Sequence, residues 1–432
     1  MKNVKPGEVD AVTMNLYPFQ KAGRDFLAAR NVALLADQMR LGKSIQSIAA
    51  ADQIGACKIL VVCPASARVV WGEQWKKWQT KSRYVTVGHP GVDITGRDRI
   101  GMSVLIIGYT RPEDELPEQE YDLVIVDECH YLKTASAERT KRIYRIIKTA
   151  PRVWFLSGTP CPNGNYAEMW PILRMTGRCG YTYSDFVEKF CKGYQPARGD
   201  FRITGHKPGA DEAIAKMLDG FMLRRKLVDV WPDLPPVHTE FYPVERPPNV
   251  EFDEMLDGRV HVAASVGGFY LDSELTTWRR LTGLAKVRGV VEVVKQELEA
   301  GLDKIVLFAW HKEVIEGLRE GLKKYSPVVI VGSTSPESRK TAVEQFKTSP
   351  KVKVFIGNIQ AAGEALDLSV ACEVGFVELG WNPGTNDQPA ARVQGINQKR
   401  PVRIRIFTLH ASADGFVSRV IARKTQSLNV LF

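Results

Sequence analysis

The chain has 432 residues, of which 44% are hydrophobic and 25% charged, so its size and composition predict a globular protein with two or three domains. Its net charge of +10 and pI of about 9.1 favour a polyanionic partner, although a solvated basic surface is the alternative. The seven cysteines form no Cys-x-x-Cys pair and have no histidine cluster near them, which argues against a disulfide framework or a zinc site.

No signal-peptide-like stretch starts the chain and no run approaches 18 apolar residues, so we expect a soluble, unexported protein in a reducing cytosol.

The positive charge is concentrated near the C-terminus. From Gln388 onward there is one acid, Asp414, against eight basic residues: Arg392, Lys399, Arg400, Arg403, Arg405, Arg419, Arg423 and Lys424.

Five wholly apolar runs in the first part of the chain predict strands buried on both faces of a parallel sheet. They begin at residues 32, 59, 104, 123 and 153 and read VALLA, ILVVC, VLIIG, LVIVD and VWFLS. Helical stretches lie between them, as an α/β domain requires. The last third repeats the plan, with strands predicted from residues 305, 328, 352, 373 and 403: IVLFAW, VVIVG, VKVFIG, EVGFVEL and RIRIFTL.

Between these two parts, apolar residues recur at helical spacing, for example in AIAKMLDGFMLRR and VRGVVEVVKQELEAG. Gly/Pro-rich breaks occur at 196–209 and 231–236. We predict a first lobe over residues 1–240 with a mostly helical insertion from about residue 160. Bridging helices and a second lobe would follow over residues 241–432.

The first motif with chemical potential is the loop from Asp37 to Ser44, between VALLA and the helical stretch IQSIAAA. Strand, loop, Gly-Lys-Ser and helix form the context of a phosphate-binding loop, where backbone N–H groups and the positive helix end hold phosphates. Lys43 would reach the β- and γ-phosphates, and Ser44 would ligate magnesium. Asp37 stands where a strict pattern has glycine, so an ordinary surface turn is the alternative.

The second motif is the acidic end of LVIVD, where Asp127 and Glu128 precede Cys129 and His130. Asp127 would hold magnesium, and Glu128 would orient and deprotonate the attacking water. His130 would sense the γ-phosphate or contact the next motif. The alternative is that the two acids only cap a helix.

The third motif, Ser157 to Pro160, follows VWFLS and brings hydroxyl groups to the end of another predicted strand. These hydroxyls would link the nucleotide site to the rest of the lobe, whereas taken alone the segment could be a plain turn. The ordered set of three motifs is far more specific than any one of them.

Together these residues resemble a superfamily 2 helicase core, specifically its SWI/SNF branch. LLADQMRLGKSIQ, VIVDECHYLK and LSGTPCPN are similar to three motifs of that branch, LYPFQKAGRDFL to its adenine-sensing segment, and FMLRRKLVDVWPDLPP to a stretch typical of SWI/SNF motors. GLAKVRGVVEVV, KIVLFAWHKEVI, VGSTSPESR, ELGWNPG and QPAARVQGINQ extend the resemblance over nearly the whole chain. KIVLFAWHKEVIEGL and FVEKFCKGY are most similar to compact annealing-helicase-like and phage-type members.

The resemblance implies an α/β fold of two RecA-like parallel-sheet lobes with a helical insertion, and a DNA-stimulated ATPase that uses ATP and Mg²⁺. It assigns nucleotide binding to Gln20, at the adenine, and to Leu41, Gly42, Lys43, Ser44 and Ile45. It assigns Mg²⁺ to Ser44 and Asp127, and catalysis to Lys43, Asp127, Glu128 and Arg392, the last arriving from the second lobe. Coupling falls to His130, Ser157, Thr159 and Gln388, and nucleic-acid phosphates to Ser66, Arg224, Arg225, Trp310, Ser333, Thr334 and Gln360.

The chain departs from the family pattern at five positions. Arg40 and Gln38 replace a glycine and a glutamate in the phosphate loop, and Ala365, Gly395 and Asn397 replace a glycine, an arginine and a glycine in the second lobe. A bulky cation in the phosphate loop must fit a backbone that favours glycine. We expect these departures to affect catalytic rate rather than fold.

The predicted function is an ATP-driven motor on duplex or branched DNA that rewinds strands or remodels forks, with contacts mainly to the phosphate backbone. A nucleotide-gated DNA clamp with little turnover and an RNA helicase are the alternatives. No membrane partner is expected, a monomer is the expected state, and the location would be the cytoplasm of a bacterium or of a phage-infected host cell.

Overall fold

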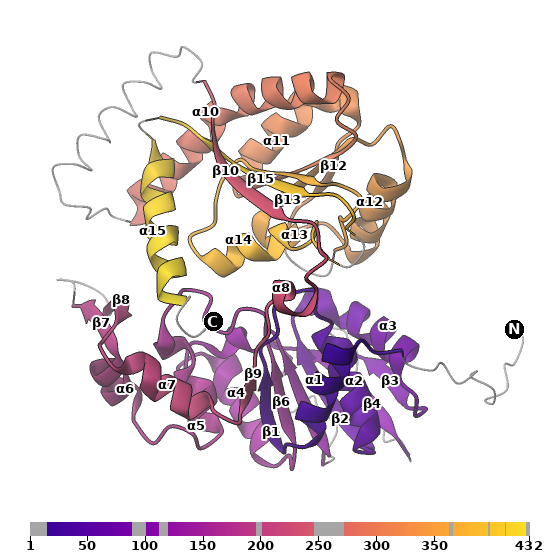
Figure 1. The fold of residues 1–432 in the computed structure, drawn as a ribbon, viewed down its shortest axis with the longest axis vertical. Helices are drawn as coiled ribbons and strands as arrows, with labels where there is room; N and C mark the ends of the chain where they lie inside the picture. Colours follow the sequence, from indigo (N-terminus) through magenta and orange to yellow (C-terminus); the bar gives the residue numbers. More distant parts are fainter. Residues whose placement is uncertain are drawn as a thin grey trace, which may run out of the picture. The chain divides into compact units, whose positions relative to one another are not determined.

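The computed structural model describes residues 15–88, 101–111, 120–195, 201–245, 272–362, 366–395, 398–410 and 412–428. The chain forms two compact units (Figure 1). Unit 1 holds the residues up to Cys161 and Asn165–Val230, and unit 2 holds Pro162–Gly164 and Trp231–Val430.

Unit 1 is built on a seven-stranded sheet in the order β3-β4-β2-β5-β6-β1-β9, with all its paired strands parallel. Its strands are β1 (Val32–Leu35), β2 (Lys58–Cys63), β3 (Tyr84–Val87), β4 (Ser103–Gly108), β5 (Leu123–Asp127), β6 (Val153–Leu156) and β9 (Met222–Leu223). Its helices are α1 (Pro18–Ala28), α2 (Lys43–Gln53), α3 (Arg68–Trp78), α4 (Glu138–Lys148) and α8 (Leu227–Val230), with short 3₁₀ turns η1 (Ala65–Ala67) and η2 (Cys129–Leu132). The five predicted strands are confirmed, because each apolar run is buried in this sheet.

The insertion after β6 is mostly helical, as predicted. It contains η3 (Tyr166–Glu168), α5 (Trp170–Met175), α6 (Tyr183–Phe190) and α7 (Ala210–Leu218). It also contains a two-stranded antiparallel sheet that was not predicted, formed by β7 (Cys191–Tyr194) and β8 (Arg202–His206).

The helical prediction for AIAKMLDGFMLRR is wrong in its second half. Helix α7 ends at Leu218, Gly220 takes a left-handed φ of 65°, and β9 then pairs with the open edge of β1. A left-handed glycine ends a helix without the penalty that other residues incur. The backbone of the following residues is then satisfied by the sheet.

Unit 2 is built on a six-stranded parallel sheet in the order β10-β15-β14-β11-β13-β12. The strands are β10 (Val237–Pro243), β11 (Ile305–Ala309), β12 (Val328–Ile330), β13 (Val354–Asn358), β14 (Glu373–Phe376) and β15 (Val402–Thr408). The helices are α10 (Asp272–Glu299), α11 (Lys312–Gly321), α12 (Pro336–Thr348), α13 (Ile359–Ala362), α14 (Pro383–Ala390) and α15 (Ala413–Leu428), with the 3₁₀ turn η4 (Lys323–Tyr325).

The predicted lobe boundary at 240/241 falls inside β10, which pairs along its length with β15 and is therefore part of the second sheet. Strand β10 lies at the sheet edge and is largely exposed, so it has no apolar run that could have predicted it.

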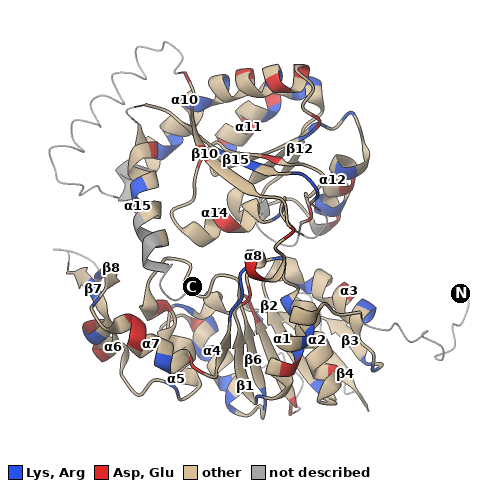
Figure 2. Cartoon of the chain, in the orientation of Figure 1, with Lys and Arg blue, Asp and Glu red and all other residues tan. Residues whose placement is uncertain are grey.

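Both faces of the second sheet are buried. Along β11, Val306 and Phe308 pack in one apolar cluster, whereas Ile305 and Leu307 pack in another. Alternate residues of a strand point to opposite faces, so two clusters on one strand mean helices on both sides. In unit 1 the strands carry few charged residues, which gather instead on the helices (Figure 2).

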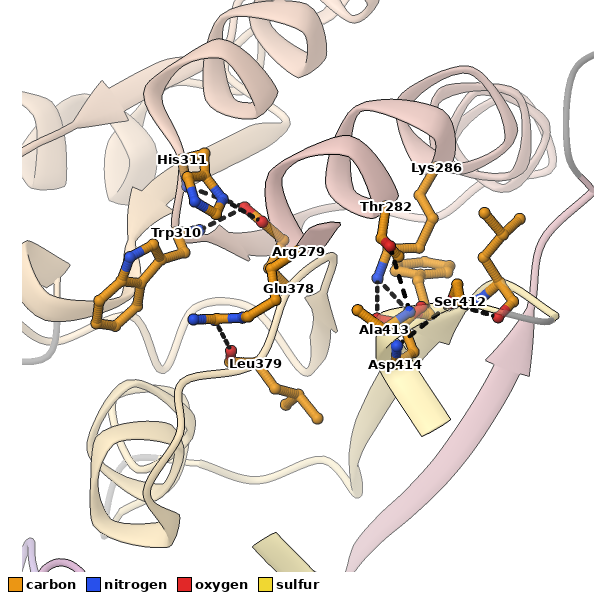
Figure 3. A network of polar contacts seen from close by, with 12 residues as sticks. Arg279, Thr282, Lys286, Trp310, His311, Glu378, Leu379, Ser412, Ala413 and Asp414 are labelled. Carbon is orange, nitrogen blue, oxygen red and sulfur yellow. Dashed lines mark hydrogen bonds and ion pairs between the residues drawn. The ribbon is translucent and has the colours of Figure 1, made fainter. Parts of the chain in front are cut away.

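The long helix α10 is held on unit 2 by buried basic side chains (Figure 3). Lys286 donates to Phe407 O at 3.0 Å and to Asp414 Oδ1 at 2.8 Å, and Arg279 donates to Leu379 O at 2.6 Å. Over the described residues, no helix is both long and apolar enough to cross a bilayer.

Candidate active site

The three predicted motifs of unit 1 follow three adjacent strands. In the sheet β5 pairs with β6, and β6 pairs with β1. The loop from Asp37 follows β1, Ser157 follows β6, and Asp127 ends β5. Because parallel strands end at the same edge, the three motifs meet there, which is where α/β sheets bind ligands.

The turn that begins helix α2 depends on glycine at position 42. Gly42 has a left-handed φ of 74°, and a Cβ added there would lie 2.7 Å from Gln20 Nε2. Gln20 is buried, and its Nε2 donates to Leu41 O at 3.4 Å. The structure therefore places Gln20 beside the phosphate loop, while its contact with adenine stays a prediction.

Arg40 adopts the backbone conformation that explains the glycine of the family pattern. Its φ is 72°, in the left-handed region, where a side chain costs about 1–2 kcal/mol. The loop thus keeps this geometry despite the arginine. The second departure, Gln38, has its own structural use, because its Oε1 accepts from Leu227 N at 2.6 Å.

Lys43 lies at the start of α2, and its Nζ donates to Asp37 O at 2.8 Å. Burial lowers the pKa of Lys43, while the nearby carboxylates of Glu128, Asp37 and Asp127 act in the opposite direction. The ammonium group therefore lies within the field of the two acids at the end of β5. The sequence had assigned these residues to one site, and their roles at a bound nucleotide stay predictions.

Asp37 holds the phosphate loop in place through buried hydrogen bonds, a role that was not predicted. It is fully buried and accepts from Arg225 Nε at 2.9 Å, from Arg225 Nη2, and from Gln46 Nε2 at 3.1 Å. Gln46 also donates to Leu41 O at 2.9 Å. Asp37 thus links the end of β1, helix α2 and Arg225, which follows β9, in one buried network.

Arg224 is also engaged within unit 1. Its Nη1 donates to Ala36 O at 2.8 Å and to Gly158 O at 3.2 Å, which links the ends of β1 and β6. Burial lowers the pKa of its guanidinium. The DNA contacts predicted for Arg224 and Arg225 stay predictions. Both side chains already bond within unit 1, Arg224 to Ala36 O and Gly158 O and Arg225 to Asp37.

Asp127 is oriented by two groups that the sequence did not single out. The indole Nε1 of Trp71, on α3, donates to Asp127 Oδ2 at 2.7 Å, and Tyr109 Oη donates to Asp127 O at 2.6 Å. Burial and the adjacent Glu128 carboxylate raise the pKa of Asp127, against the lowering effects of Trp71 and Lys43. The sequence alone indicated only that Trp71 packs in the core and gave no sign that it bonds to Asp127.

A polar chain connects the second and third motifs. Glu128 Oε2 lies 3.2 Å from His130 Nδ1, and that nitrogen lies 3.1 Å from Ser157 Oγ. Ser157 Oγ in turn accepts from Thr159 N at 3.1 Å. The structure therefore brings together the three coupling residues predicted for unit 1, His130, Ser157 and Thr159, next to Glu128.

The donor set suits Mg²⁺ bound together with a nucleotide. Magnesium prefers oxygen ligands and is usually held by one or two carboxylates plus substrate phosphates. Ser44, in the first turn of α2, and Asp127 supply a hydroxyl and a carboxylate. Over the described parts of the chain, no cluster of three or more His, Cys, Asp or Glu residues could form an all-protein metal site.

Four of the predicted nucleic-acid residues follow strands of unit 2 in the same way. Trp310 follows β11, Ser333 and Thr334 follow β12, and Gln360 follows β13, and these three strands are neighbours. Arg339 joins two of the loops, because its Nε donates to Thr334 O at 3.0 Å and its Nη1 to Ala361 O at 2.8 Å. They therefore lie at one edge of the second sheet, while their contacts with DNA stay predictions.

Trp310 is held by a buried network (Figure 3). The backbone N–H groups of Trp310 and His311 donate to Glu378 Oε2 at 2.8 and 2.9 Å. The ring atom His311 Nδ1 lies 2.6 Å from Glu378 Oε1. The guanidinium of Arg279 lies 5.5 Å from the Trp310 ring and 4.5 Å from the Trp381 ring. These contacts give Trp310 a defined position at the strand end.

The remaining predicted residues are placed as follows. Ser66 lies in η1 after β2, and its buried Oγ has no hydrogen-bond partner among the described residues. Gln388 lies in α14 and Arg392 follows that helix in unit 2. Their predicted roles at the nucleotide stay predictions.

Gly395 differs from the family arginine in backbone as well as side chain. Its φ of 136° is a conformation that L side chains rarely adopt. An arginine there would require a local change of backbone. Ala365 and Asn397, the other departures in the second lobe, lie outside the described residues.

We expect Trp71→Phe to raise the Mg²⁺ concentration for half-maximal ATP hydrolysis about tenfold, because loss of a partner that orients a metal ligand weakens metal binding. Calorimetric titration of ADP with and without Mg²⁺ provides a readout independent of turnover. Trp75→Phe is the matched control, because Trp75 lies on the same helix, is equally buried, and its Nε1 has no hydrogen-bond partner in the described structure. Equal shifts in both variants would contradict the role of Trp71.

Two protein families match the chain. The SNF2-related domain matches residues 19–245, more than half of the chain, and the helicase conserved C-terminal domain matches residues 286–396. The first match contains the three motifs of unit 1, and the second contains the strand-end residues of unit 2.

Similar proteins include the SWI/SNF-related matrix-associated actin-dependent regulator of chromatin subfamily A-like protein 1 of Xenopus tropicalis, 31% identical over 427 residues, or 96% of this chain and 44% of that protein. The DNA annealing helicase and endonuclease ZRANB3 of Mus musculus is 30% identical over 438 residues, covering 96% of this chain and 41% of that protein. The chain thus spans less than half the length of these relatives.

A solved structure, the Sulfolobus solfataricus SWI2/SNF2 ATPase core in complex with dsDNA, is 23% identical with a TM-score of 0.47, covering 94% of this chain and 90% of that one. On the strength of the domain match over residues 19–245, the chain belongs to the SNF2-related family of helicase-type ATPases.

Proposed function

We propose that the chain is an ATP-driven translocase that couples hydrolysis to movement along DNA. The observation that carries this proposal is the meeting of Lys43, Asp127 and Glu128 at one sheet edge, with the lysine in the field of both acids. A phosphate-binding lysine beside two carboxylates is the arrangement that hydrolysis of a magnesium–nucleoside triphosphate requires.

For hydrolysis, Lys43 and the backbone N–H groups at the start of α2 bind the β- and γ-phosphates. Ser44 and Asp127 would hold Mg²⁺, which when bound neutralises charge on the phosphates. Glu128 orients the attacking water and accepts its proton. His130 contacts both Glu128 and Ser157, so it would connect the third motif to Glu128, the general base. Arg392 is proposed to stabilise the transferring phosphoryl group.

The nucleic-acid partner is proposed to be DNA, mainly duplex or branched, bound through its phosphate backbone. The net charge of +10 supports a polyanionic partner, and the strand-end residues of unit 2 offer hydroxyl, amide and indole donors. One relative is named a DNA annealing helicase, which supports strand rewinding. The proposed activity is strand rewinding or fork remodelling, in DNA repair or replication. We propose a monomer that acts in the cytoplasm of a bacterium or of a phage-infected host cell.

The test is the rate of phosphate release with no nucleic acid, duplex DNA, forked DNA, single-stranded DNA and RNA. We expect duplex or forked DNA to stimulate hydrolysis at least tenfold, and we expect duplex binding to weaken at least about tenfold between roughly 50 and 200 mM salt. Tight duplex binding without turnover would instead identify a nucleotide-gated clamp. Stimulation by RNA above that by DNA would identify an RNA helicase.

A further inference from the structure

The β7–β8 hairpin in the insertion of unit 1 has no part in the ATP site. It belongs to neither main sheet and lies beside α6 and α7 (Figure 1). The hairpin is packed against η3 and α7 at its base. The His206 ring stacks on Tyr166 with centroids 3.6 Å apart, and Tyr166 Oη donates to Asp211 Oδ1 at 2.6 Å. The buried Cys191 pairs with His206 across the two strands.

The outer end of the hairpin exposes two aromatic rings. Tyr194 is 40% exposed and Phe201 is 43% exposed. A side chain at Gly193 would collide with the Phe201 ring and with Arg202 O, so glycine allows the ring to lie across the neighbouring strand. The strands are also irregular between Lys192 and Gly193. The two rings offer flat apolar faces on which a planar ligand could stack.

The charge of the hairpin is positive, while the helices beside it carry acids. Strands β7 and β8 carry Lys192 and Arg202 and no acidic residue, and Lys207 follows β8. Acidic side chains lie on α6 and α7 (Figure 2), at Asp185, Glu188, Asp211 and Glu212. A polyanion would therefore be attracted to the strands themselves rather than to the flanking helices.

We propose that the β7–β8 hairpin binds an unpaired DNA strand, with bases stacked on Tyr194 and Phe201 and phosphates beside Lys192 and Arg202. Exposed rings among basic side chains suit single strands, because an unpaired base offers its flat face whereas a paired base inside a duplex does not. An apolar protein partner would leave the positive charge without a counterpart. The inference rests on the proposed function and deepens it, since a motor with such a contact would prefer branched DNA to plain duplex.

The experiment measures binding of the full chain to a fluorescent oligothymidine strand and to a blunt duplex by anisotropy. We expect the double variant Tyr194→Ala, Phe201→Ala to weaken oligothymidine binding about tenfold or more, and Arg202→Glu to weaken it several-fold. Tyr194→Phe keeps a stacking ring and should bind within about twofold of the unaltered protein. Duplex binding and duplex-stimulated hydrolysis should be unchanged in all three variants.

The matched control is Tyr144→Ala, which removes a ring of similar exposure, 45%, from the outside of α4. Unchanged oligothymidine binding in both the double variant and Arg202→Glu would overturn the inference, as would equal weakening by Tyr144→Ala. Failure of the proposed function would look different, because the unaltered chain would then show no duplex-stimulated hydrolysis. If the unaltered chain is stimulated by duplex DNA but the hairpin variants bind oligothymidine as well as it does, only the hairpin inference is refuted and the proposed function stands.

Discussion

Lys43→Ala is expected to reduce DNA-stimulated ATP turnover by about 100-fold or more, because the variant loses the cation that stabilises the transferring phosphate. The structure supports a large effect, since Lys43 is a partly buried ammonium at the start of α2 in the field of Glu128, Asp37 and Asp127. Phosphate release at saturating duplex DNA and ATP is the measurement. Circular dichroism and thermal unfolding would establish that the fold is retained.

Lys76→Ala is the control for this experiment. Lys76 is an exposed lysine in the last turn of α3, so its loss removes one positive charge from unit 1 without touching the phosphate loop. Turnover in that variant should stay within about twofold of the unaltered protein. Near-normal turnover by Lys43→Ala would refute the phosphate-loop assignment, and with it the ATP-driven motor.

Arg225→Ala is expected to destabilise unit 1 by about 3–5 kcal/mol, because removing one partner of a buried ion pair leaves the other charge uncompensated. Arg225 donates to both carboxylate oxygens of Asp37, which is fully buried, and also to Gln46 and Phe19 O. The measurement is the denaturant midpoint of the transition that reports on unit 1, since two compact units need not unfold together.

An exposed pair of the same chemistry provides the comparison. Arg24 bonds to Asp25 at 2.8 Å, with side chains 31% and 52% exposed, so Arg24→Ala should cost at most about 1 kcal/mol. The double variant Arg225→Met, Asp37→Asn should recover much of the loss, because it removes the stranded charge. If Arg24→Ala and Arg225→Ala were equally destabilising, the buried network would not be what holds the phosphate loop.

The sequence alone determined the parallel sheets and the edge at which the site forms. Strands such as β2 and β11 are buried on both faces, and a strand with two apolar environments must be a continuous apolar run. Lys43, Asp127 and Ser157 each follow or end such a run, so their meeting could be predicted from parallel pairing. Edge strands such as β10 escaped prediction because one side of them faces solvent and their composition is mixed.

Only the tertiary structure decided which groups support the site. Asp37 and Arg225 are 188 residues apart, and Trp71 and Asp127 are 56 apart. Local patterns report how a segment is buried and how its own backbone is bonded, whereas a partner brought in by chain topology leaves no mark near the residue it binds. The same holds for the glycine-dependent packing of Phe201, which became visible only when two strands of the insertion lay side by side.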